Sequence, residues 1–138
     1  MVVRARKAQI SLRKLLIIDG DTRLLASYRD LLAPYGFHVL TAADGDKAID
    51  LIDENPDIML LILDVVMPNM DGRQWLRWYR EQRKDCPVLI ISSYKLCEAD
   101  DDLHPSAVLE KPFHPAELLD LVGLFCGLGT PTGSYGSI

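Results

Sequence analysis

Four residues with charged or reactive side chains each follow a short apolar stretch of the chain, and they are Asp19, Asp64, Ser92 and Lys111. Two carboxylates from separate segments, completed by a backbone carbonyl and water, form the hard oxygen ligand set that Mg²⁺ prefers. An aspartate carboxylate is also a nucleophile that can take a phosphoryl group as an acyl phosphate. A lysine ammonium neutralises charge on the transferring oxygens, and a hydroxyl donates a hydrogen bond to one of them. The four residue types therefore favour magnesium-assisted phosphoryl chemistry, provided that the fold brings them together.

The apolar stretches are typical of buried strands. Each is short and continuous, as expected for strands covered on both faces in a parallel sheet. A lone aspartate after a strand is usually a turn former or a helix cap. The carboxyl ends of parallel strands meet at one edge of the sheet, however, so four such ends indicate a shared site. The three stronger strand candidates are Leu15–Ile18, Ile58–Leu63 and Val88–Ile91, and the two weaker ones are Phe37–Thr41 and Ala107–Leu109.

Segments with helical periodicity alternate with these strands. The clearest has apolar residues from Leu24 to Tyr35 at spacings of three and four, with Pro34 and Gly36 as stop signals. Five strands alternating with helices predict an α/β protein with a doubly wound parallel sheet and helices on both faces. The other helices are expected around Ala48–Ile52, Trp75–Tyr79 and Leu118–Phe125, the last beginning near Pro115.

Composition and charge restrict the class of protein. The 138 residues carry a net charge of −5, but residues 1–14 hold five bases and no acid, and the rest hold 10 bases against 20 acids. An acidic body argues against nucleic-acid binding by the fold itself. The longest apolar run is far shorter than the roughly 20 residues that cross a bilayer, and no signal peptide is recognisable, so a cytoplasmic protein without a membrane partner is expected. Three cysteines without a Cys-x-x-Cys pair favour neither disulfides nor a zinc site.

The chain is long enough for one domain with its own core. The predicted organisation is a basic N-terminal extension over 1–13, a folded domain over 14–126 and a flexible tail or linker stub over 127–138. The stretch Tyr94–Pro105 has few apolar positions, so any helix there is expected to be short or frayed.

Three motifs resemble the response-regulator receiver domain of two-component signalling, and the similarity extends from about Lys14 to Phe125. The residues Leu61–Gly72, with Asp64 and Met67-Pro68, look like the phosphoacceptor loop of that family. Lys111-Pro112-Phe113 and Pro87–Ser92 look like two further family segments, in the family's order. The resemblance implies a flavodoxin-like, chemotaxis-regulator-like sheet with strand order 2-1-3-4-5.

The resemblance also implies a role for each candidate residue. Asp64 would be the phosphoacceptor, and Asp19, Asp64 and the backbone carbonyl of Val66 would bind Mg²⁺. Ser92 would be the switch hydroxyl and Lys111 the ammonium of the site. The expected phosphodonor is a histidine kinase or a phosphotransfer protein, and the domain is expected to be a substrate of phosphoryl transfer that relays a signal by a conformational change, rather than an enzyme.

Departures from the family pattern leave alternatives open. The family usually has two adjacent acids after the first strand, whereas this chain has Asp19-Gly20-Asp21, which is expected to weaken Mg²⁺ binding; Asp21 either reaches the metal or caps the next helix. Val108 stands where an aromatic residue is common. The leading interpretation is a phosphoacceptor switch. The alternatives are a degenerate receiver that acts as a phosphorylation-independent interaction module and, less favoured, a flavodoxin-like cofactor protein.

Overall fold

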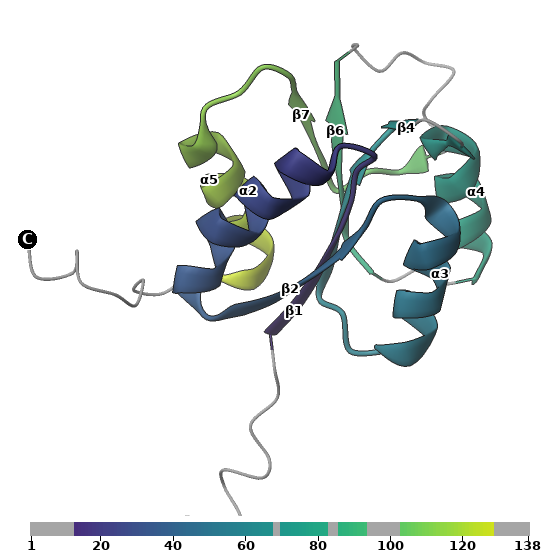
Figure 1. Ribbon diagram of the computed structural model, residues 1–138, viewed down its shortest axis with the longest axis horizontal. Helices are drawn as coiled ribbons and strands as arrows, with labels where there is room; N and C mark the ends of the chain where they lie inside the picture. The colour runs from purple at the N-terminus through teal and green to yellow at the C-terminus, as the bar shows by residue number, and fades with distance from the viewer. Residues whose placement is uncertain (1–12, 68–69, 83–85, 94–102, 129–138) are drawn as a thin grey trace, which may run out of the picture.

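The computed structural model describes residues 13–67, 70–82, 86–93 and 103–128, and a parallel sheet lies at its centre (Figure 1). Its strands are β1 (Arg13–Ile18), β2 (Phe37–Ala42), β3 (Leu60–Asp64), β6 (Val88–Ser92) and β7 (Ala107–Glu110). Their order in the sheet is β2-β1-β3-β6-β7, and every neighbouring pair is parallel. The predicted five-stranded, doubly wound sheet with order 2-1-3-4-5 is confirmed.

The α-helices of the described residues lie in two layers around this sheet (Figure 1). On one face are α2 (Thr22–Leu32), extended by the 3₁₀ turn η1 (Ala33–Tyr35), and α5 (Pro115–Cys126). On the other face are α3 (Gly45–Glu54) and α4 (Gly72–Gln82). Two short strands that the periodicity did not predict, β4 (Val66–Met67) and β5 (Met70–Asp71), form an antiparallel pair between β3 and α4.

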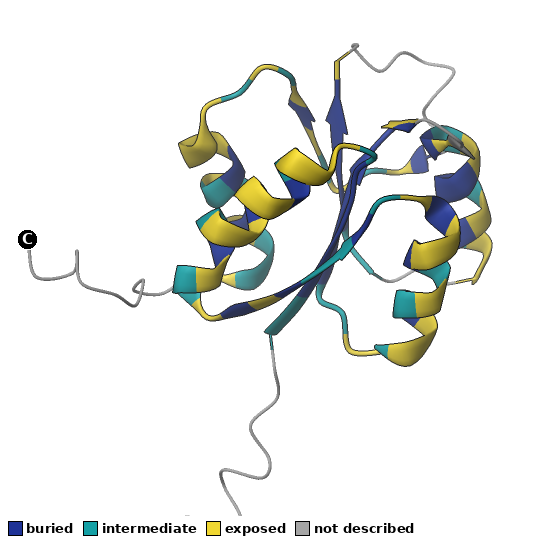
Figure 2. Ribbon diagram, viewed as in Figure 1, coloured by how far each residue is buried: buried dark blue, intermediate teal, exposed yellow. Residues whose placement is uncertain are grey.

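The strands β3 and β6 and residues Leu15–Ile18 of β1 are buried because both faces of the sheet are covered there, and Figure 2 shows this centre of the sheet in dark blue. The outer strands β2 and β7 each keep exposed residues. Alternate residues of β1 point to opposite faces. Leu15 and Ile17 therefore pack toward α2 and α5, whereas Leu16 and Ile18 pack toward α3 and α4. All four are essentially inaccessible to solvent, and each contributes roughly 1.5–3 kcal/mol by burial of its side chain.

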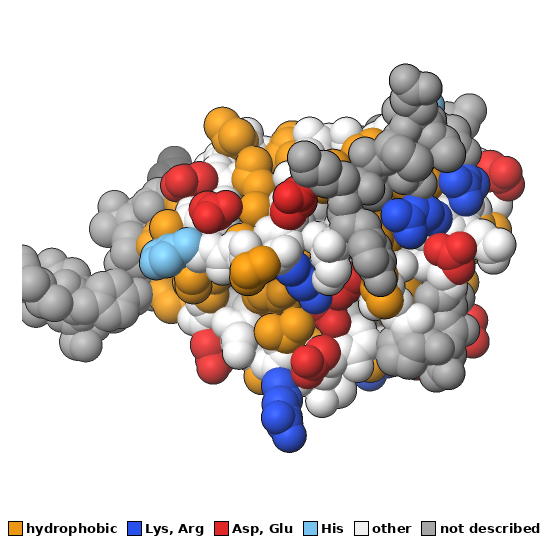
Figure 3. Space-filling view, turned by 90° about the horizontal axis from the view of Figure 1, so that it is seen from above, with side chains coloured by type: hydrophobic (Ala, Val, Ile, Leu, Met, Phe, Trp, Pro, Cys, Tyr) orange, Lys and Arg blue, Asp and Glu red, His pale blue; other side chains and the backbone are white. Residues whose placement is uncertain are grey.

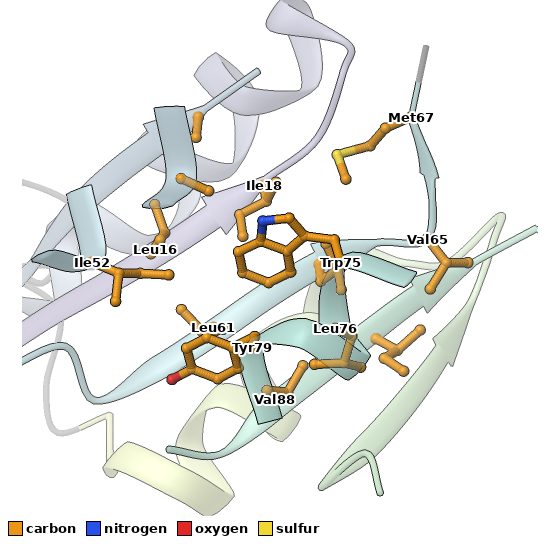
Figure 4. Packing of buried hydrophobic residues seen from close by; sticks show 14 of the residues in the cluster. Leu16, Ile18, Ile52, Leu61, Val65, Met67, Trp75, Leu76, Tyr79 and Val88 are labelled. Carbon is orange, nitrogen blue, oxygen red and sulfur yellow. The ribbon is translucent and has the colours of Figure 1, made fainter. Parts of the chain in front are cut away.

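Two aromatic side chains of α4, Trp75 and Tyr79, pack in the core between this helix and the sheet, as Figure 4 shows. The ring of Trp75 stacks on that of Tyr79, with centroids 5.5 Å apart and planes within 4°. The Trp75 indole N–H donates to the carbonyl of Gly45 at 3.2 Å, so its polar atom has a partner although the side chain is buried. The helix expected around Trp75–Tyr79 is confirmed; Trp75, Leu76 and Tyr79 are buried, and Trp78 lies off this face with 38% of its surface exposed.

At the amino end of β1, which is the end of the sheet opposite the predicted site, Arg13 joins the first strand to the last helix. Its guanidinium donates to the carbonyls of Cys126 and Gly127, which end α5, and its Cζ lies 4.3 Å from the centroid of the Phe37 ring. Arg13 was assigned to the basic extension, but it begins β1. Its positive charge is useful here because the last carbonyls of a helix carry partial negative charge.

The rest of the predicted extension and most of the predicted tail lie outside the described residues, as do residues 94–102 of the weak segment Tyr94–Pro105. Cys86 and Cys126 are both partly buried, and the Cys86 thiol donates to the carbonyl of Ile58 at 3.7 Å. Within the described part of the chain, each helix is too short or too polar to cross a membrane.

Candidate functional site

Asp19 lies directly beyond the end of β1 and is almost completely buried, with 3% of its surface exposed. Its backbone N–H donates to the carbonyl of Ala42 at 3.1 Å, which extends the β1–β2 pairing by one bond. Its Oδ1 accepts a hydrogen bond from the backbone N–H of Asp21 at 2.9 Å. The side chain is thus held by the turn that leads into α2.

Asp64 is the last residue of β3 and is also buried, with 6% exposed. Its Oδ1 accepts the backbone N–H of Val66 at 2.9 Å, so the following loop orients the carboxylate. The loop returns closely to itself, because the Gly72 N–H donates to the carbonyl of Val65 at 3.1 Å. A Cβ at position 72 would lie 2.6 Å from the Cα of Val65, and this explains why glycine stands there.

Lys111 follows β7 and joins the two carboxylates. Its backbone N–H donates to the carbonyl of Ser92 at 2.8 Å, which fixes its place beside β6. Its Nζ donates to Asp64 Oδ2 at 2.6 Å and lies 3.7 Å from Asp19 Oδ2. Partial burial lowers the pKa of the Lys111 ammonium, but the hydrogen bond to Asp64 and the charges of Asp19 and Asp64 outweigh it, so the net pKa is raised.

The structure therefore brings Asp19, Asp64 and Lys111 into direct contact, as the strand-end argument predicts. Ser92 is fully buried at the end of β6, and its carbonyl is the part that contacts Lys111. Val66 lies at the mouth of the site, with its side chain half exposed. These residues lie at the same edge of the sheet, while their proposed roles remain predictions.

The charges at this edge are only partly balanced. Burial raises the pKa of the Asp19 carboxyl, and the neighbouring Asp64 charge adds to this, against the Asp21 N–H and Lys111, which lower it. Asp19 Oδ2 is buried and has no hydrogen-bond partner among the described residues. A buried carboxylate oxygen without a donor is unfavourable by itself, so it indicates a ligand position.

The residues present fit a magnesium ion with a reduced set of carboxylates. Asp19 and Asp64 supply two, which is within the one or two that Mg²⁺ usually takes from a protein, with waters completing the shell. Gly20 supplies none. The Asp21 side chain caps α2 instead, because its Oδ1 accepts the backbone N–H groups of Arg23 and Leu24 at 2.9 and 3.4 Å. Of the two roles predicted for Asp21, the structure shows the helix cap. Because Asp21 does not join Asp19 and Asp64, the described residues contain no cluster of three metal-ligating side chains.

A hollow of about 580 Å³ opens over the three residues and is bordered by Gly20, Val66 and Met67. Figure 3 looks onto this edge of the sheet and shows acidic and basic side chains together near the middle of the face, with hydrophobic side chains beside them. The hollow is large enough to admit a phosphoryl group and water.

Tyr28 and Phe113 are neighbours of the site whose contact with each other the sequence does not predict. The helical stripe of α2 identifies Tyr28 as a core residue, which it is, with 6% exposed. The pattern carries no signal that its ring stacks on Phe113, two residues beyond Lys111. Val108, which stands where the family commonly has an aromatic residue, lies on β7, and 40% of its surface is exposed.

Comparison with known proteins agrees with the family resemblance of the sequence motifs. The family model of the response regulator receiver domain matches residues 15–123. Transcriptional regulatory protein CpxR of Escherichia coli strain K12 is 36% identical over 112 residues, which cover 78% of this chain and 47% of that protein. Response regulator MprA of Mycobacterium sp. strain KMS is 36% identical over 110 residues, which cover 77% and 47%. The chain thus spans about half the length of these curated relatives.

A solved structure of the chemotaxis protein CheY4 from Vibrio cholerae matches with a TM-score of 0.75 and 27% identity, over 83% of this chain and 99% of that one. The matched family segment includes the three residues in contact at the edge of the sheet. It also includes all five strands, except for the first two residues of β1. Receiver domains generally bind Mg²⁺ at their phosphorylation site and interact with histidine kinases or phosphotransfer proteins. The chain belongs to the response regulator receiver domains of two-component systems.

Proposed function

We propose that this receiver domain accepts a phosphoryl group on Asp64 from a phosphohistidine and passes the signal on by a conformational change. The observation that carries the proposal is the contact of Lys111 Nζ with Asp64 Oδ2 at 2.6 Å, beside Asp19 Oδ2, which has no hydrogen-bond donor among the described residues. A lysine, a presented carboxylate and a second carboxylate with one oxygen that lacks a hydrogen-bond donor are together suited to phosphoryl transfer. The same geometry argues against the degenerate-receiver alternative.

In the proposed reaction, an oxygen of the Asp64 carboxylate attacks the phosphorus, and the P–N bond of the phosphohistidine breaks, leaving the electron pair on the imidazole nitrogen. The Val66 N–H holds the carboxylate in its orientation through Oδ1. Lys111 is placed to neutralise the charge that the new phosphoryl group brings. A Mg²⁺ ion held by Asp19, Asp64 and the Val66 carbonyl would supply further positive charge toward the phosphoryl oxygens.

The proposed donor is a histidine kinase or a phosphotransfer protein in the cytoplasm, and the domain is modified by it without turning over a substrate of its own. Direct nucleic-acid binding is not part of the proposal, since 20 acids against 10 bases follow the first 14 residues.

Incubation with acetyl phosphate and Mg²⁺, followed by intact-protein mass spectrometry, tests the proposal. The wild-type chain should gain one phosphoryl group. Asp64→Asn, which keeps the shape but removes the nucleophile, should gain none, while Asp120→Asn, an exposed acid of α5, should behave as wild type. A wild-type chain that takes up no phosphate under these conditions would instead support a phosphorylation-independent interaction module.

A further inference from the structure

Tyr28 is a buried core residue of α2 that also neighbours the candidate site. It lies on the same buried face of the helix as Leu25 and Leu32. Burial and the carboxylates of Asp19 and Asp64 raise the pKa of its hydroxyl well above the ordinary value. One end of this side chain is therefore within electrostatic reach of the two site carboxylates, although Tyr28 belongs to neither the strands nor the loops that carry them.

The ring of Tyr28 stacks on the ring of Phe113, with centroids 6.3 Å apart and planes inclined by 16°. Offset stacking of this kind favours one relative placement of two rings over others. Phe113 is separated from Lys111 by a single proline. Lys111, Phe113 and Tyr28 also line one groove of about 930 Å³ between α2 and the segment that leads into α5.

The backbone on either side of Phe113 is anchored independently. On one side, the Lys111 N–H is bound to the Ser92 carbonyl. On the other side, His114 caps α5: its Nδ1 accepts the Ala116 N–H at 3.0 Å, and its own N–H donates to Glu117 at 3.3 Å. Between these two anchors, the stack on Tyr28 is a specific ring contact that links the Lys111–Phe113 segment to α2.

We propose that Tyr28 is a positioning residue of the phosphoacceptor site: its ring holds Phe113, and through it keeps the Lys111 ammonium directed at Asp64. The placement of Lys111 follows from the contacts above, whereas its consequence for phosphoryl uptake rests on the proposed function. A lysine that samples other positions spends less time where the phosphoryl charge develops, so transfer slows.

The test compares Tyr28→Leu, which removes the stack, with Tyr28→Phe, which keeps the ring and removes the hydroxyl. Tyr35→Leu is the matched control, because Tyr35 is a partly buried tyrosine after the same helix but at the far end from the site. Phe113→Leu removes the other ring and serves where Tyr28→Leu does not fold. The first readout is NMR relaxation of the ¹³C-labelled side-chain terminus of Lys111, which reports picosecond–nanosecond order and requires no phosphorylation.

Lys111 should be ordered in the wild type, in Tyr28→Phe and in Tyr35→Leu, and mobile in Tyr28→Leu and Phe113→Leu. The rate of phosphoryl uptake from acetyl phosphate should fall about fivefold in Tyr28→Leu and stay within about twofold of wild type in Tyr28→Phe. The inference is overturned if Lys111 stays ordered without the stack, if Tyr28→Phe or Tyr35→Leu mobilises it equally, or if it becomes mobile while the rate is unchanged. If even the wild type takes up no phosphate, the proposed function fails, and the relaxation data still decide whether Tyr28 positions Lys111.

Discussion

The two ends of the central sheet differ in how completely their charged side chains are paired. At the carboxyl ends of the strands, Lys111 stands beside two buried carboxylates, and Asp19 keeps one oxygen without a hydrogen-bond partner. At the amino end of β1, the guanidinium of Arg13 is bound to carbonyls at the end of α5, and Lys14 Nζ donates to Asn55 at 2.9 Å and to Asp57 at 3.0 Å.

The difference shows which end stabilises the fold and which end is available for chemistry. The cations at the amino end already have acceptors among the described residues, so their charges are available to stabilise the fold. The carboxyl end holds two anions against one cation in a buried setting, which is unfavourable for folding and useful for binding a cation or a phosphoryl group. Substitutions at the two ends should therefore separate activity from stability.

The largest effect is expected at the functional end. Lys111→Met should lower the rate of phosphoryl uptake from acetyl phosphate about a hundredfold, since it removes the positive charge that faces the developing phosphoryl charge. Lys14→Met, the same change at the other end of the sheet, should leave the rate within about twofold. Stopped time courses by mass spectrometry measure both rates, and equal rates for the two variants would mean that Lys111 has no special role.

At the structural end, Arg13→Ala should lower the free energy of unfolding by about 2 kcal/mol, because hydrogen bonds from a charged donor to the end of α5 are lost. Phosphoryl uptake should be unaffected at temperatures where the variant is folded. Urea titration gives the stability, with Arg13→Lys as an intermediate control that keeps the charge. A variant as stable as wild type would show that the contact between β1 and α5 contributes nothing.

Removing the buried acid should stabilise the protein. The pKa of Asp19 is raised by folding, so the folded state binds its proton more tightly and the ionised carboxylate opposes folding at neutral pH. Asp19→Asn should therefore raise the free energy of unfolding at pH 7 by about 1 kcal/mol. The gain should shrink as the pH falls through the raised pKa and vanish below the ordinary value of 3.8.

Asp57 provides the opposite sign for comparison. The hydrogen bond from Lys14 lowers its pKa, so ionised Asp57 stabilises the fold above its ordinary pKa, and this contribution is lost as the pH falls through the lowered value. Asp57→Asn should thus reduce stability at pH 7. Denaturant midpoints measured from pH 3 to pH 8 check both variants, and changes of the same sign would contradict the contrast between the two ends.

The smallest effect is expected from restoring the second acid of the family pattern. Gly20→Asp should tighten Mg²⁺ binding by about threefold, because it adds one anionic ligand or a carboxylate that binds a metal-bound water. Isothermal titration calorimetry measures the affinity, with Asp120→Asn as the control. If the affinity is unchanged, the two carboxylates and the Val66 carbonyl already provide what the ion needs.

The features predictable from sequence are those fixed by local pattern. The continuous apolar stretch at 58–63 has no polar face, so a strand buried on both sides was the natural expectation, and the acid that follows such a strand must lie at the sheet edge. The cap by Asp21 was left as one of two alternatives, because an aspartate before a helix is equally placed to turn inward or to accept the first N–H groups.

What remained hidden depends on residues far apart in the chain. Arg13 belongs to a run of basic residues that is typical of a solvated extension, and the two carbonyls at the end of α5 that it binds lie more than 110 positions away. The stack of Tyr28 on Phe113 likewise needs α2 and the start of α5 to be packed side by side. The hairpin of β4 and β5 is too short to have a periodicity.

The central claim is that the buried edge formed by Asp19, Asp64 and Lys111 is a phosphoacceptor site with Asp64 as its nucleophile. Trapping the phosphorylated protein with borohydride, which reduces an aspartyl phosphate to homoserine, and locating the product by tandem mass spectrometry tests this directly. The modification should be found at position 64 and should disappear when Mg²⁺ is chelated. Modification at Asp19, at Asp21 or at several surface acids in equal yield would contradict the assignment.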